Sequence, residues 1–311
     1  MKRNLFITGA SGCVGHYIFD QLVKDPEWQL YLLLRDPSKL KRDLKLFPNV
    51  KVIRGEMKDI VRQADLLKTM DAVVHVAAGW GDSETNCDYT RELFRLLDPA
   101  RCQKVIYFST ASILDEKNDL NPVVAKIGTC YITSKYQLSQ ELPQMPIYPR
   151  VITLFPTWVL GGDDRHPYSH AMEGIVNATK QLWWLRFLNF DLKFHFIHAQ
   201  DIALITDYLL KNENAPQKYV LGNTATSVDQ VIAETCAYFK VNRPFRINIS
   251  RRPLNWIVNL LGKRISEWDK YCLNRREFVH QVSDAATFGL VSKHRTISQI
   301  LSHVLGQSGY G

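Results

Sequence analysis

The sequence lacks any apolar run of the roughly 18 residues that a bilayer-spanning helix needs. A strand-like run begins at Asn4, so no room is left after Met1 for a secretory signal peptide. Internal repeats and low-complexity segments are also absent. Hydrophobic residues make up 46% of the chain and charged residues 23%, which argues against long disordered segments. We therefore expect a folded cytoplasmic protein without a transmembrane segment.

Cysteine is scarce, and no two cysteines are closely spaced. This pattern gives neither a disulfide framework nor a metal site, so we expect free thiols and no bound metal. The six cysteines are Cys13, Cys87, Cys102, Cys130, Cys236 and Cys272.

Positive charge is in excess, with a net charge of +8 that is concentrated between Val241 and Arg276. Nine basic residues in this stretch face only Glu267 and Asp269, which leaves a local charge of +7. A solvated basic face, a site for an anionic substrate tail and peripheral contact with a membrane all remain open. Nucleic acid is disfavoured, because neither an aromatic and basic single-strand platform nor helix-turn-helix spacing is present.

The first half of the chain alternates apolar strand-like runs with segments whose apolar residues recur every three or four positions. Several runs are apolar at consecutive positions, as in parallel strands that are buried on both faces. This alternation predicts an α/β fold with a Rossmann-type doubly wound parallel sheet. The expected strands are Asn4–Thr8, Leu30–Leu34, Lys51–Arg54, Ala72–Val76, Lys104–Phe108 and Tyr148–Leu154. The expected helices between them include Val14–Val23 and Tyr89–Leu97.

The second half is less regular, and we expect a smaller substrate-binding part there. A break near residue 155 separates a cofactor-binding domain, residues 1–155, from a mainly substrate-binding part, residues 156–311, that interleaves with it. Aromatic residues gather between Gln181 and Phe196, which indicates core packing or the apolar wall of a substrate pocket. The expected helices are Asp201–Leu210, Ser227–Phe239, Pro253–Ile265 and Thr296–Leu305, with Ser227 as an N-cap.

A glycine-rich segment joins the first expected strand to the first expected helix. Glycines at such a junction allow a tight turn and let the backbone approach a pyrophosphate at the helix N-terminus. The position of the segment favours a dinucleotide site over a plain turn. The candidate cofactor-binding residues are Gly9, Ser11, Gly12, Cys13, Val14 and Gly15.

Arg35 directly follows the second expected strand, where enzymes specific for NAD usually place a carboxylate. A guanidinium at this position suits the 2′-phosphate of NADP(H). Asp36 follows directly and would favour NAD if Arg35 pointed outward, whereas the nearby Lys39, Lys41 and Arg42 support the phosphate. We therefore predict NADP(H) as the cofactor.

The ends of the third and fourth expected strands suit the same cofactor. Glu56 and Met57 follow the third strand, where an acidic side chain can accept the adenine amino group. Ala77 and Ala78 follow the fourth strand, where small residues let the backbone pack against the cofactor. His75 is interpreted as a buried structural histidine.

Tyr131 and Lys135 are spaced four residues apart, which places them on one face of a helix. A free phenol has a pKa of about 10, and a nearby ammonium would lower it toward useful acid–base behaviour. The fifth strand ends in a hydroxyl cluster, Ser109, Thr110 and Ser112, that can bind a substrate carbonyl.

With these segments in this order, the chain resembles the extended short-chain dehydrogenase/reductase superfamily, of the NAD-dependent epimerase/dehydratase type, over most of its length. The resemblance includes Phe155–Val159 and Phe196–Ala203. It implies that Tyr131 exchanges a proton with the reacting oxygen and that Lys135 lowers the tyrosine pKa and holds the nicotinamide ribose. It also implies that Thr110 takes the role of the superfamily's catalytic Ser or Thr, and it places Pro156 beside the cofactor.

The segment Leu34–Arg42 looks most like the NADP-binding region of dihydroflavonol and cinnamoyl-CoA reductases. The chain departs from the superfamily pattern at Glu56, where Asp is usual, and at Ile113–Asp115, which replaces Val-Tyr-Gly. It also lacks the Asn-x-x-Gly-Thr helix signature, and Phe155 stands where Arg commonly precedes the proline. These departures leave the expected fold unchanged, but they weaken any inference of the substrate from a named subfamily.

Three functions are consistent with the sequence. The first is an NADP(H)-dependent oxidoreductase that interconverts a carbonyl and an alcohol on a largely apolar small molecule. The second is a nucleotide-sugar epimerase or dehydratase that holds NAD tightly, and Arg35 weighs against it. The third is a non-enzymatic NADP-binding regulatory or assembly protein, and intact Thr110, Tyr131 and Lys135 weigh against it. The superfamily leads us to expect a homodimer.

Overall fold

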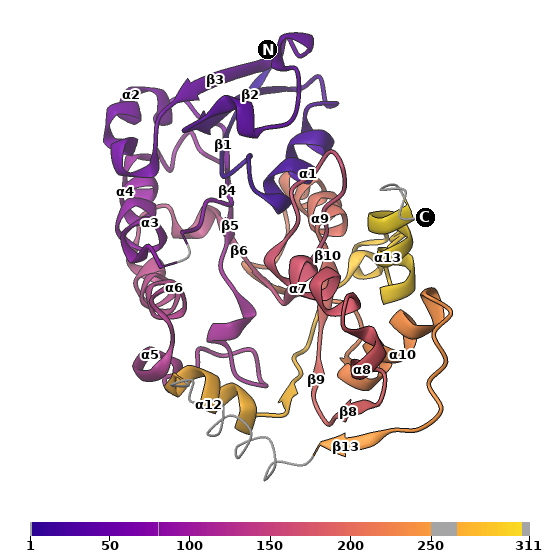
Figure 1. The fold of residues 1–311 in the computed structure, drawn as a ribbon. Helices are drawn as coiled ribbons and strands as arrows, with labels where there is room; N and C mark the ends of the chain where they lie inside the picture. The colour runs from indigo at the N-terminus through magenta and orange to yellow at the C-terminus, as the bar shows by residue number, and fades with distance from the viewer. Residues whose placement is uncertain (1, 80, 250–265, 307–311) are drawn as a thin grey trace.

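The computed structural model describes residues 2–79, 81–249 and 266–306. Within these ranges a parallel sheet of seven strands forms the centre of the molecule, in the order β11-β6-β5-β4-β1-β2-β3 (Figure 1). The strands are β1 (Arg3–Thr8), β2 (Trp28–Leu34), β3 (Val50–Arg54), β4 (Ala72–His75), β5 (Lys104–Phe108), β6 (Val151–Pro156) and β11 (Lys218–Leu221). The predicted doubly wound α/β fold is confirmed.

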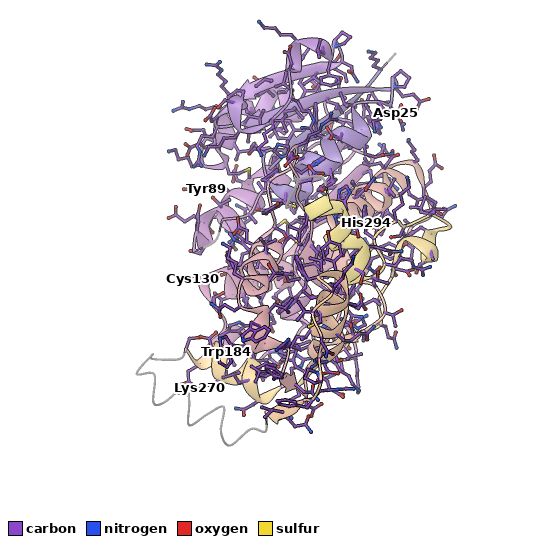
Figure 2. All side chains as sticks on the ribbon, turned by 45° about the vertical axis from the view of Figure 1, so that its right-hand side comes forward. Asp25, Tyr89, Cys130, Trp184, Lys270 and His294 are labelled. Atoms are coloured by element: carbon purple, nitrogen blue, oxygen red, sulfur yellow. The ribbon has the colours of Figure 1, made fainter. Side chains whose placement is uncertain are left out.

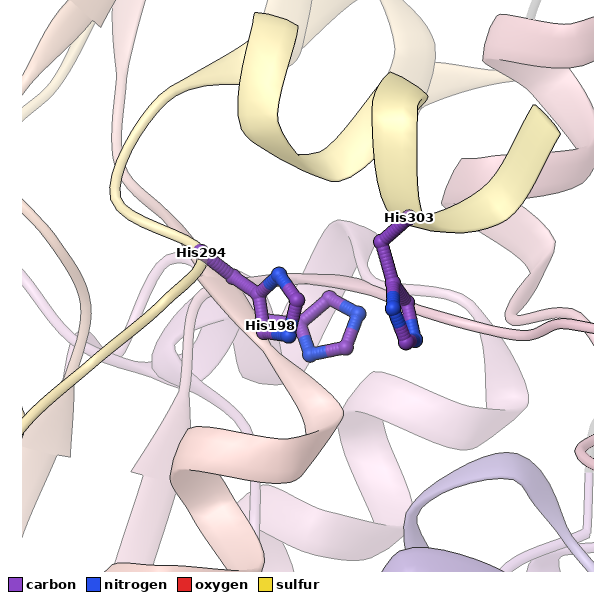
Figure 3. A group of neighbouring side chains, drawn as sticks. All are labelled: His198, His294 and His303. Carbon is purple, nitrogen blue, oxygen red and sulfur yellow. The ribbon is translucent and has the colours of Figure 1, made fainter. Parts of the chain in front are cut away.

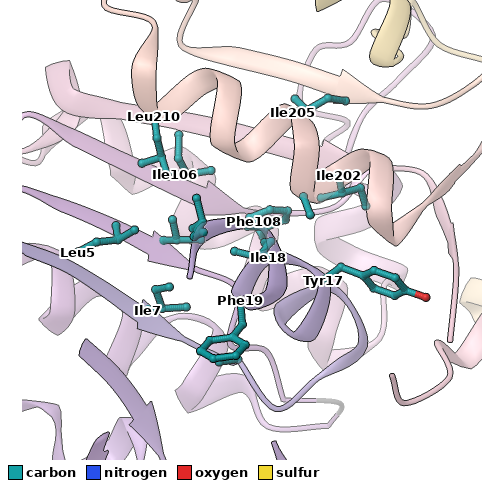
Figure 4. Close-up of a cluster of buried hydrophobic side chains, with 14 of the residues drawn as sticks. Leu5, Ile7, Tyr17, Ile18, Phe19, Ile106, Phe108, Ile202, Ile205 and Leu210 are labelled. Carbon is teal, nitrogen blue, oxygen red and sulfur yellow. The ribbon is translucent and has the colours of Figure 1, made fainter. Parts of the chain in front are cut away.

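Helices cover both faces of the sheet because the strands bury side chains on both sides. Leu5 and Ile7 of β1 pack in one hydrophobic cluster, together with Ile18 of α1 (Cys13–Leu22) and Ile202 of α9 (Ala199–Lys211), as Figure 4 shows. Phe6, between them on β1, points the other way into a second cluster. The helices on that second face are α2 (Ala64–Leu67), α3 (Ser83–Asn86), α4 (Asp88–Leu96) and α6 (Cys130–Glu141).

The chain beyond residue 156 contributes to the central layers as well as to the smaller part. Strand β11 pairs in parallel with β6, and α9 packs against α1 on the sheet. The remaining strands form short ladders below the sheet: β7 (Trp158–Leu160), β8 (Leu188–Phe190), β9 (Lys193–Phe194), β10 (Phe196–His198), β12 (Thr226–Ser227), β13 (Ile247–Ile249) and β14 (Glu277–Phe278). The remaining helices are α5 (Val124–Ile127), α7 (His170–Thr179), α8 (Leu182–Leu185), α10 (Val228–Tyr238), α12 (Glu267–Asn274) and α13 (Ile297–Gly306).

Most predicted elements occur within one or two residues of their expected bounds. The exception is the sixth strand, which begins at Val151 and not at Tyr148, because Pro149 lies in a 3₁₀ turn over Tyr148–Arg150. Ser227 caps α10 as predicted, with its side chain accepting a hydrogen bond from the Gln230 amide. The predicted helix Pro253–Ile265 lies outside the described residues. None of the described helices has the length and apolar character needed to cross a membrane.

Candidate active site

The glycine-rich loop after β1 folds as a tight turn into α1. Gly9 has φ of +77°, and a Cβ there would lie 2.5 Å from the backbone nitrogen of Ala77 on the loop after β4. A Cβ at Gly15 would lie 2.0 Å from the carbonyl oxygen of Gly9. These two glycines therefore bring the turn, the helix and the end of β4 into direct backbone contact.

The N-terminus of α1 has the features of an anion site. Gly12 is the exposed N-cap, no side chain caps the helix, and no acidic residue lies in its first turn. Its first backbone N–H groups therefore have no capping side chain as a partner, which suits a pyrophosphate. Ser11 and Val14 are half-buried beside this end. Burial raises the pKa of the Cys13 thiol to about 12, so Cys13 stays protonated and adds no charge.

At the end of β2, the neighbouring charged residues Arg35 and Asp36 have different surroundings. Arg35 is exposed, whereas the Asp36 carboxylate accepts hydrogen bonds from the backbone N–H and the hydroxyl of Ser38, at 3.0 and 2.7 Å. Asp36 thus serves as a local cap, which leaves Arg35 as the charged group at the strand end.

Arg42 is not available to bind the 2′-phosphate of NADP(H), although the sequence suggested this role. Its guanidinium pairs with Asp20 and donates to the carbonyl oxygen of Arg165, and it is largely buried by these contacts. Lys41 approaches the carbonyl oxygen of Asp164 at 3.5 Å. Arg42 is therefore part of the packing between α1 and the loop after β7, because a buried guanidinium requires these partners. Lys39 remains exposed.

The other predicted cofactor residues lie at the carboxyl edge of the sheet. Glu56 and Met57 follow β3, and Glu56 forms an exposed ion pair with Lys58 at 3.1 Å. Ala77 and Ala78 follow β4, and Pro156 is the last residue of β6. The five strands that carry predicted cofactor residues thus end at one edge, where open α/β sheets bind their ligands.

His75 is the buried structural histidine that the sequence suggested. Its Nδ1 lies 2.7 Å from the Thr8 hydroxyl and its Nε2 lies 2.8 Å from the Thr90 hydroxyl. Burial lowers the pKa of His75 well below its usual range, so the ring stays neutral. It ties β1 and β4 to α4.

Thr110, Tyr131 and Lys135 come together after β5. Thr110 follows the strand and caps the short 3₁₀ helix Ala111–Ile113, with its hydroxyl accepting from the Ser112 amide at 3.2 Å. Tyr131 and Lys135 lie one turn apart on α6, and the Thr110 hydroxyl is near enough to that of Tyr131 to influence its pKa. Lys135 is fully buried, and its ammonium donates to the Phe108 carbonyl oxygen at 2.8 Å and lies over the Tyr107 ring.

The acid–base properties of this group differ from the sequence-based expectation. Burial raises the pKa of Tyr131 to about 12, and the Thr110 hydroxyl opposes the shift without reversing it. The Lys135 ammonium, which we expected to lower that pKa, is directed at the Phe108 carbonyl instead. Burial lowers the pKa of Lys135 itself to about 7. Removal from water therefore outweighs the attraction between the two groups in this arrangement.

A small pocket opens beside the hydroxyl cluster. Four of its ten lining residues are Trp or Phe, and the rings of Trp158 and Phe194 are tilted against each other with 4.7 Å between their centroids. The sequence did not single out its residues on α12 and β14, because they lie far along the chain from the catalytic segment and carry no motif. The pocket is lined by Ala111, Ser112, Thr157, Trp158, Phe194, His195, Trp268, Arg275, Phe278 and His280.

The aromatic segment around residues 181–196 divides into two groups. Phe194 and Phe196 are core residues, and Phe194 also lines the pocket. Trp183 and Trp184 on α8 are exposed, at 62% and 72%, and do not line the pocket. Trp184 is labelled in Figure 2. The expectation of an apolar wall therefore applies to the end of this segment and not to its tryptophans.

In the described part of the basic stretch between Val241 and Arg276, the arginines form ion pairs with acidic residues of the same chain. Arg243 and Arg246 both pair with Asp229, and Arg276 pairs with Asp191. Arg275 pairs with Glu116 at 3.2 Å while facing the pocket. The bases Arg251, Arg252, Lys263 and Arg264 lie outside the described residues.

Comparisons with known proteins agree with this architecture. A sequence model of the NAD dependent epimerase/dehydratase family matches residues 5–222. No curated protein sequence matches the chain.

Solved structures with the same fold include the Bordetella bronchiseptica enzyme WbmG in complex with NAD, with a TM-score of 0.70 at 16% identity, covering 100% of this chain and 96% of that one. A UDP-N-acetylglucosamine 4-epimerase from Methanobrevibacter ruminantium has a TM-score of 0.69 at 15% identity, covering 99% of each chain. The terminal R domain from the myxalamid PKS-NRPS biosynthetic pathway has a TM-score of 0.73 at 17% identity, covering 98% of this chain and 90% of that one. From the match over residues 5–222, the chain belongs to the NAD dependent epimerase/dehydratase family.

Proposed function

We propose that the chain is an NADP(H)-dependent oxidoreductase that interconverts a carbonyl and an alcohol on a largely apolar small molecule. The observation that carries this proposal is the grouping of Thr110, Tyr131 and Lys135 after β5, beside a pocket whose lining includes four Trp and Phe side chains. The nicotinamide would supply or accept the hydride when the cofactor is bound.

Each residue of the group suits one part of proton transfer. With a pKa of about 12, Tyr131 is protonated at neutral pH and can donate to a carbonyl oxygen. Thr110 can donate a second hydrogen bond to the same oxygen. Lys135 titrates near neutrality, which suits a group that returns a proton to Tyr131 and contacts the nicotinamide ribose.

The cofactor would lie along the carboxyl edge of the sheet. In our proposal the N-terminus of α1 holds the pyrophosphate, Arg35 binds the 2′-phosphate, and Glu56 and Met57 contact the adenine. Ala77, Ala78 and Pro156 line the nicotinamide end. The engagement of Asp36 by Ser38 supports NADP(H) over NAD. We propose residues 156–311 as the mainly substrate-binding part, and a cytoplasmic homodimer as the working form.

One observation favours the alternative of a nucleotide-sugar epimerase or dehydratase. Arg275 and His280 line the pocket and could contact an anionic diphosphate. A non-enzymatic NADP-binding role is less well supported, because such a protein has no need for Thr110, Tyr131 and Lys135 in one place.

The test is a panel of carbonyl compounds that includes nucleotide sugars, followed by NADPH oxidation. Tyr131→Phe should reduce turnover on the active compound by a factor of about 10² or more while cofactor binding survives. Tyr136→Phe is the matched control, because Tyr136 is buried on the same helix and its hydroxyl pairs only with Gln140 among the described residues. Turnover of nucleotide sugars alone, without net NADPH consumption, would replace the reductase with the epimerase.

A further inference from the structure

Three histidines from separate parts of the chain meet beside α13 (Figure 3). His198 ends β10 and caps α9, His294 lies in the segment before α13, and His303 lies on α13. One ring nitrogen from each lies within 4.8 Å of the other two. The ring centroids of His198 and His294 are 4.0 Å apart, and those of His294 and His303 are 4.6 Å apart.

Each of the three rings has a buried nitrogen without a hydrogen-bond partner among the described residues. They are Nε2 of His198, Nδ1 of His294 and Nε2 of His303. The His198 and His294 residues are themselves only 0% and 5% exposed. A buried nitrogen without a partner is costly, and three in one cluster are unusual in a packed core, which indicates a ligand that the rings share.

The outer contact of His294 is that of a metal-bound imidazole. Nε2 of His294 lies 2.9 Å from the Gln200 side-chain oxygen, so this nitrogen carries the proton and Nδ1 keeps its lone pair. Histidine ligands in proteins usually donate their second N–H to a carbonyl or carboxylate in this way. Nε2 of His303 lies 3.3 Å from the Asp163 carboxylate but forms no hydrogen bond with it.

The charges around the cluster suit a cation. Asp163 is buried, and its carboxylate lies 2.7 Å from Nδ1 of His166 and 3.3 Å from Nε2 of His303, so an acidic group borders the cluster.

His198 requires one adjustment. Its Nδ1 accepts a hydrogen bond from the Gln200 amide at 3.2 Å, so the proton of the neutral ring resides on Nε2. Metal binding at Nε2 moves this proton to Nδ1 and replaces the capping hydrogen bond. A single capping bond is worth far less than the bonds of a metal ion to three imidazoles.

We propose that His198, His294 and His303 bind one Zn²⁺ ion. Three imidazole nitrogens suit zinc, and a water molecule can take a fourth position on the partly exposed side of His303. The ion ties α13 to the junction of β10 and α9, so its role is to stabilise the fold. The absence of a metal site that we expected from the sequence rested on cysteines alone, whereas these histidines are brought together only by the fold.

The experiment uses the full chain after treatment with a chelator, titrated with zinc sulfate in a calorimeter. We expect one ion per chain and a Tm that rises as Zn²⁺ is added. Co²⁺ in place of Zn²⁺ should give the visible absorption bands of a tetrahedral site. No binding at one equivalent, or a Co²⁺ spectrum of an octahedral aquo ion, overturns the proposal and leaves the histidines as packing residues.

Variants locate the ion. His294→Ala and His303→Ala should each weaken zinc binding at least tenfold, and Gln200→Ala should weaken it about tenfold by removing an outer contact. His170→Ala is the matched control, because His170 lies on the surface of α7 with its side chain 69% exposed. If His303→Ala fails to fold, His294→Ala and Gln200→Ala decide the question. Binding that all these variants leave unchanged shows an adventitious surface ion and overturns the proposal.

Discussion

Lys135 is almost completely removed from water, at 1% exposure, and burial lowers its pKa to about 7 from an ordinary value of 10.5. Below pH 7 the folded and unfolded chains both bind this proton. Between pH 7 and about 10.5 only the unfolded chain binds it, so the free energy of unfolding rises with pH across this window. The slope from this one group is at most about 1.4 kcal/mol per pH unit.

We therefore predict that Lys135→Met removes part of the gain in stability between pH 7 and pH 10. The measurement is the denaturant midpoint of the cofactor-free protein at pH 7, 8, 9 and 10, compared with that of Lys126→Met, an exposed lysine on α5. The control should keep the slope of the unmodified protein. Equal slopes in both variants would mean that Lys135 is charged in the folded protein.

In the proposed function, the choice between NADP(H) and NAD depends on Arg35. If its guanidinium binds the 2′-phosphate, the protein should bind NADPH at least tenfold more tightly than NADH, which is about 1.4 kcal/mol. Arg35→Ala should remove most of this preference and leave NADH binding almost unchanged. Fluorescence titration of both cofactors measures it, with Arg62→Ala as the exposed control at 79% side-chain exposure. Equal affinity of the unmodified protein for NADPH and NADH would contradict the assignment.

The sequence identified the candidate reactive residues but not their pKa values. The hydroxyl cluster and the Tyr131/Lys135 pair were found from a strand end and a four-residue spacing, both of which are local features, and the choice of Thr110 within that cluster came from the superfamily resemblance. Their pKa values depend on burial by segments far away in the chain. No spacing rule contains this information, which is why the expected direction of the Tyr131 shift was wrong.

At the scale of helices and strands, the local sequence pattern was sufficient to predict the bounds of elements that are long and buried. Strand β5 has the predicted bounds, and α1 begins one residue before its predicted start. The pattern failed for β7, β9 and β14, because strands of two or three residues have no measurable periodicity. Those short strands carry or adjoin much of the pocket wall, so the substrate side was the least predictable part of the site.

The junction of β1 and α1 depends on Gly15 more strictly than its sequence motif alone indicates. A methyl group there would lie 2.0 Å from the carbonyl oxygen of Gly9, so the turn and the helix would have to separate. Gly15→Ala should weaken NADPH binding at least tenfold and lower the Tm. Gly174→Ala on α7 is the control, because a Cβ there meets nothing within 4 Å. This control should keep NADPH binding and gain roughly 0.5–1 kcal/mol of stability. Normal NADPH affinity in Gly15→Ala would contradict the proposed location of the pyrophosphate.

At the scale of the whole molecule, the pocket is assembled from three distant segments. The loop after β5 supplies Ser112, the region of β7 and β9 supplies Trp158 and Phe194, and the chain from α12 through β14 supplies Arg275. In the proposed function, the reactive hydroxyl groups and most of the pocket lining therefore come from opposite halves of the chain. On this proposal, recognition of the substrate could change without disturbing the reactive residues.

This division predicts separate effects of two substitutions on an identified substrate. Trp158→Ala removes an aromatic wall and should raise KM for an apolar carbonyl compound by about tenfold, or about 1.4 kcal/mol, with kcat nearly unchanged. Arg275→Gln should raise KM for an anionic substrate much more than for a neutral one of the same shape, and added salt should reproduce the difference in the unmodified protein.

Comparing two substrates within one variant cancels any loss of packing from the contacts of Arg275 with Glu116 and Leu114. Arg276→Gln, beside it in the chain but paired with Asp191, should affect neither substrate. An Arg275→Gln variant that impairs both substrates equally would show that this guanidinium only holds the pocket wall. The apolar carbonyl would then bind without a charged anchor, and the argument for an anionic diphosphate would lose its main support.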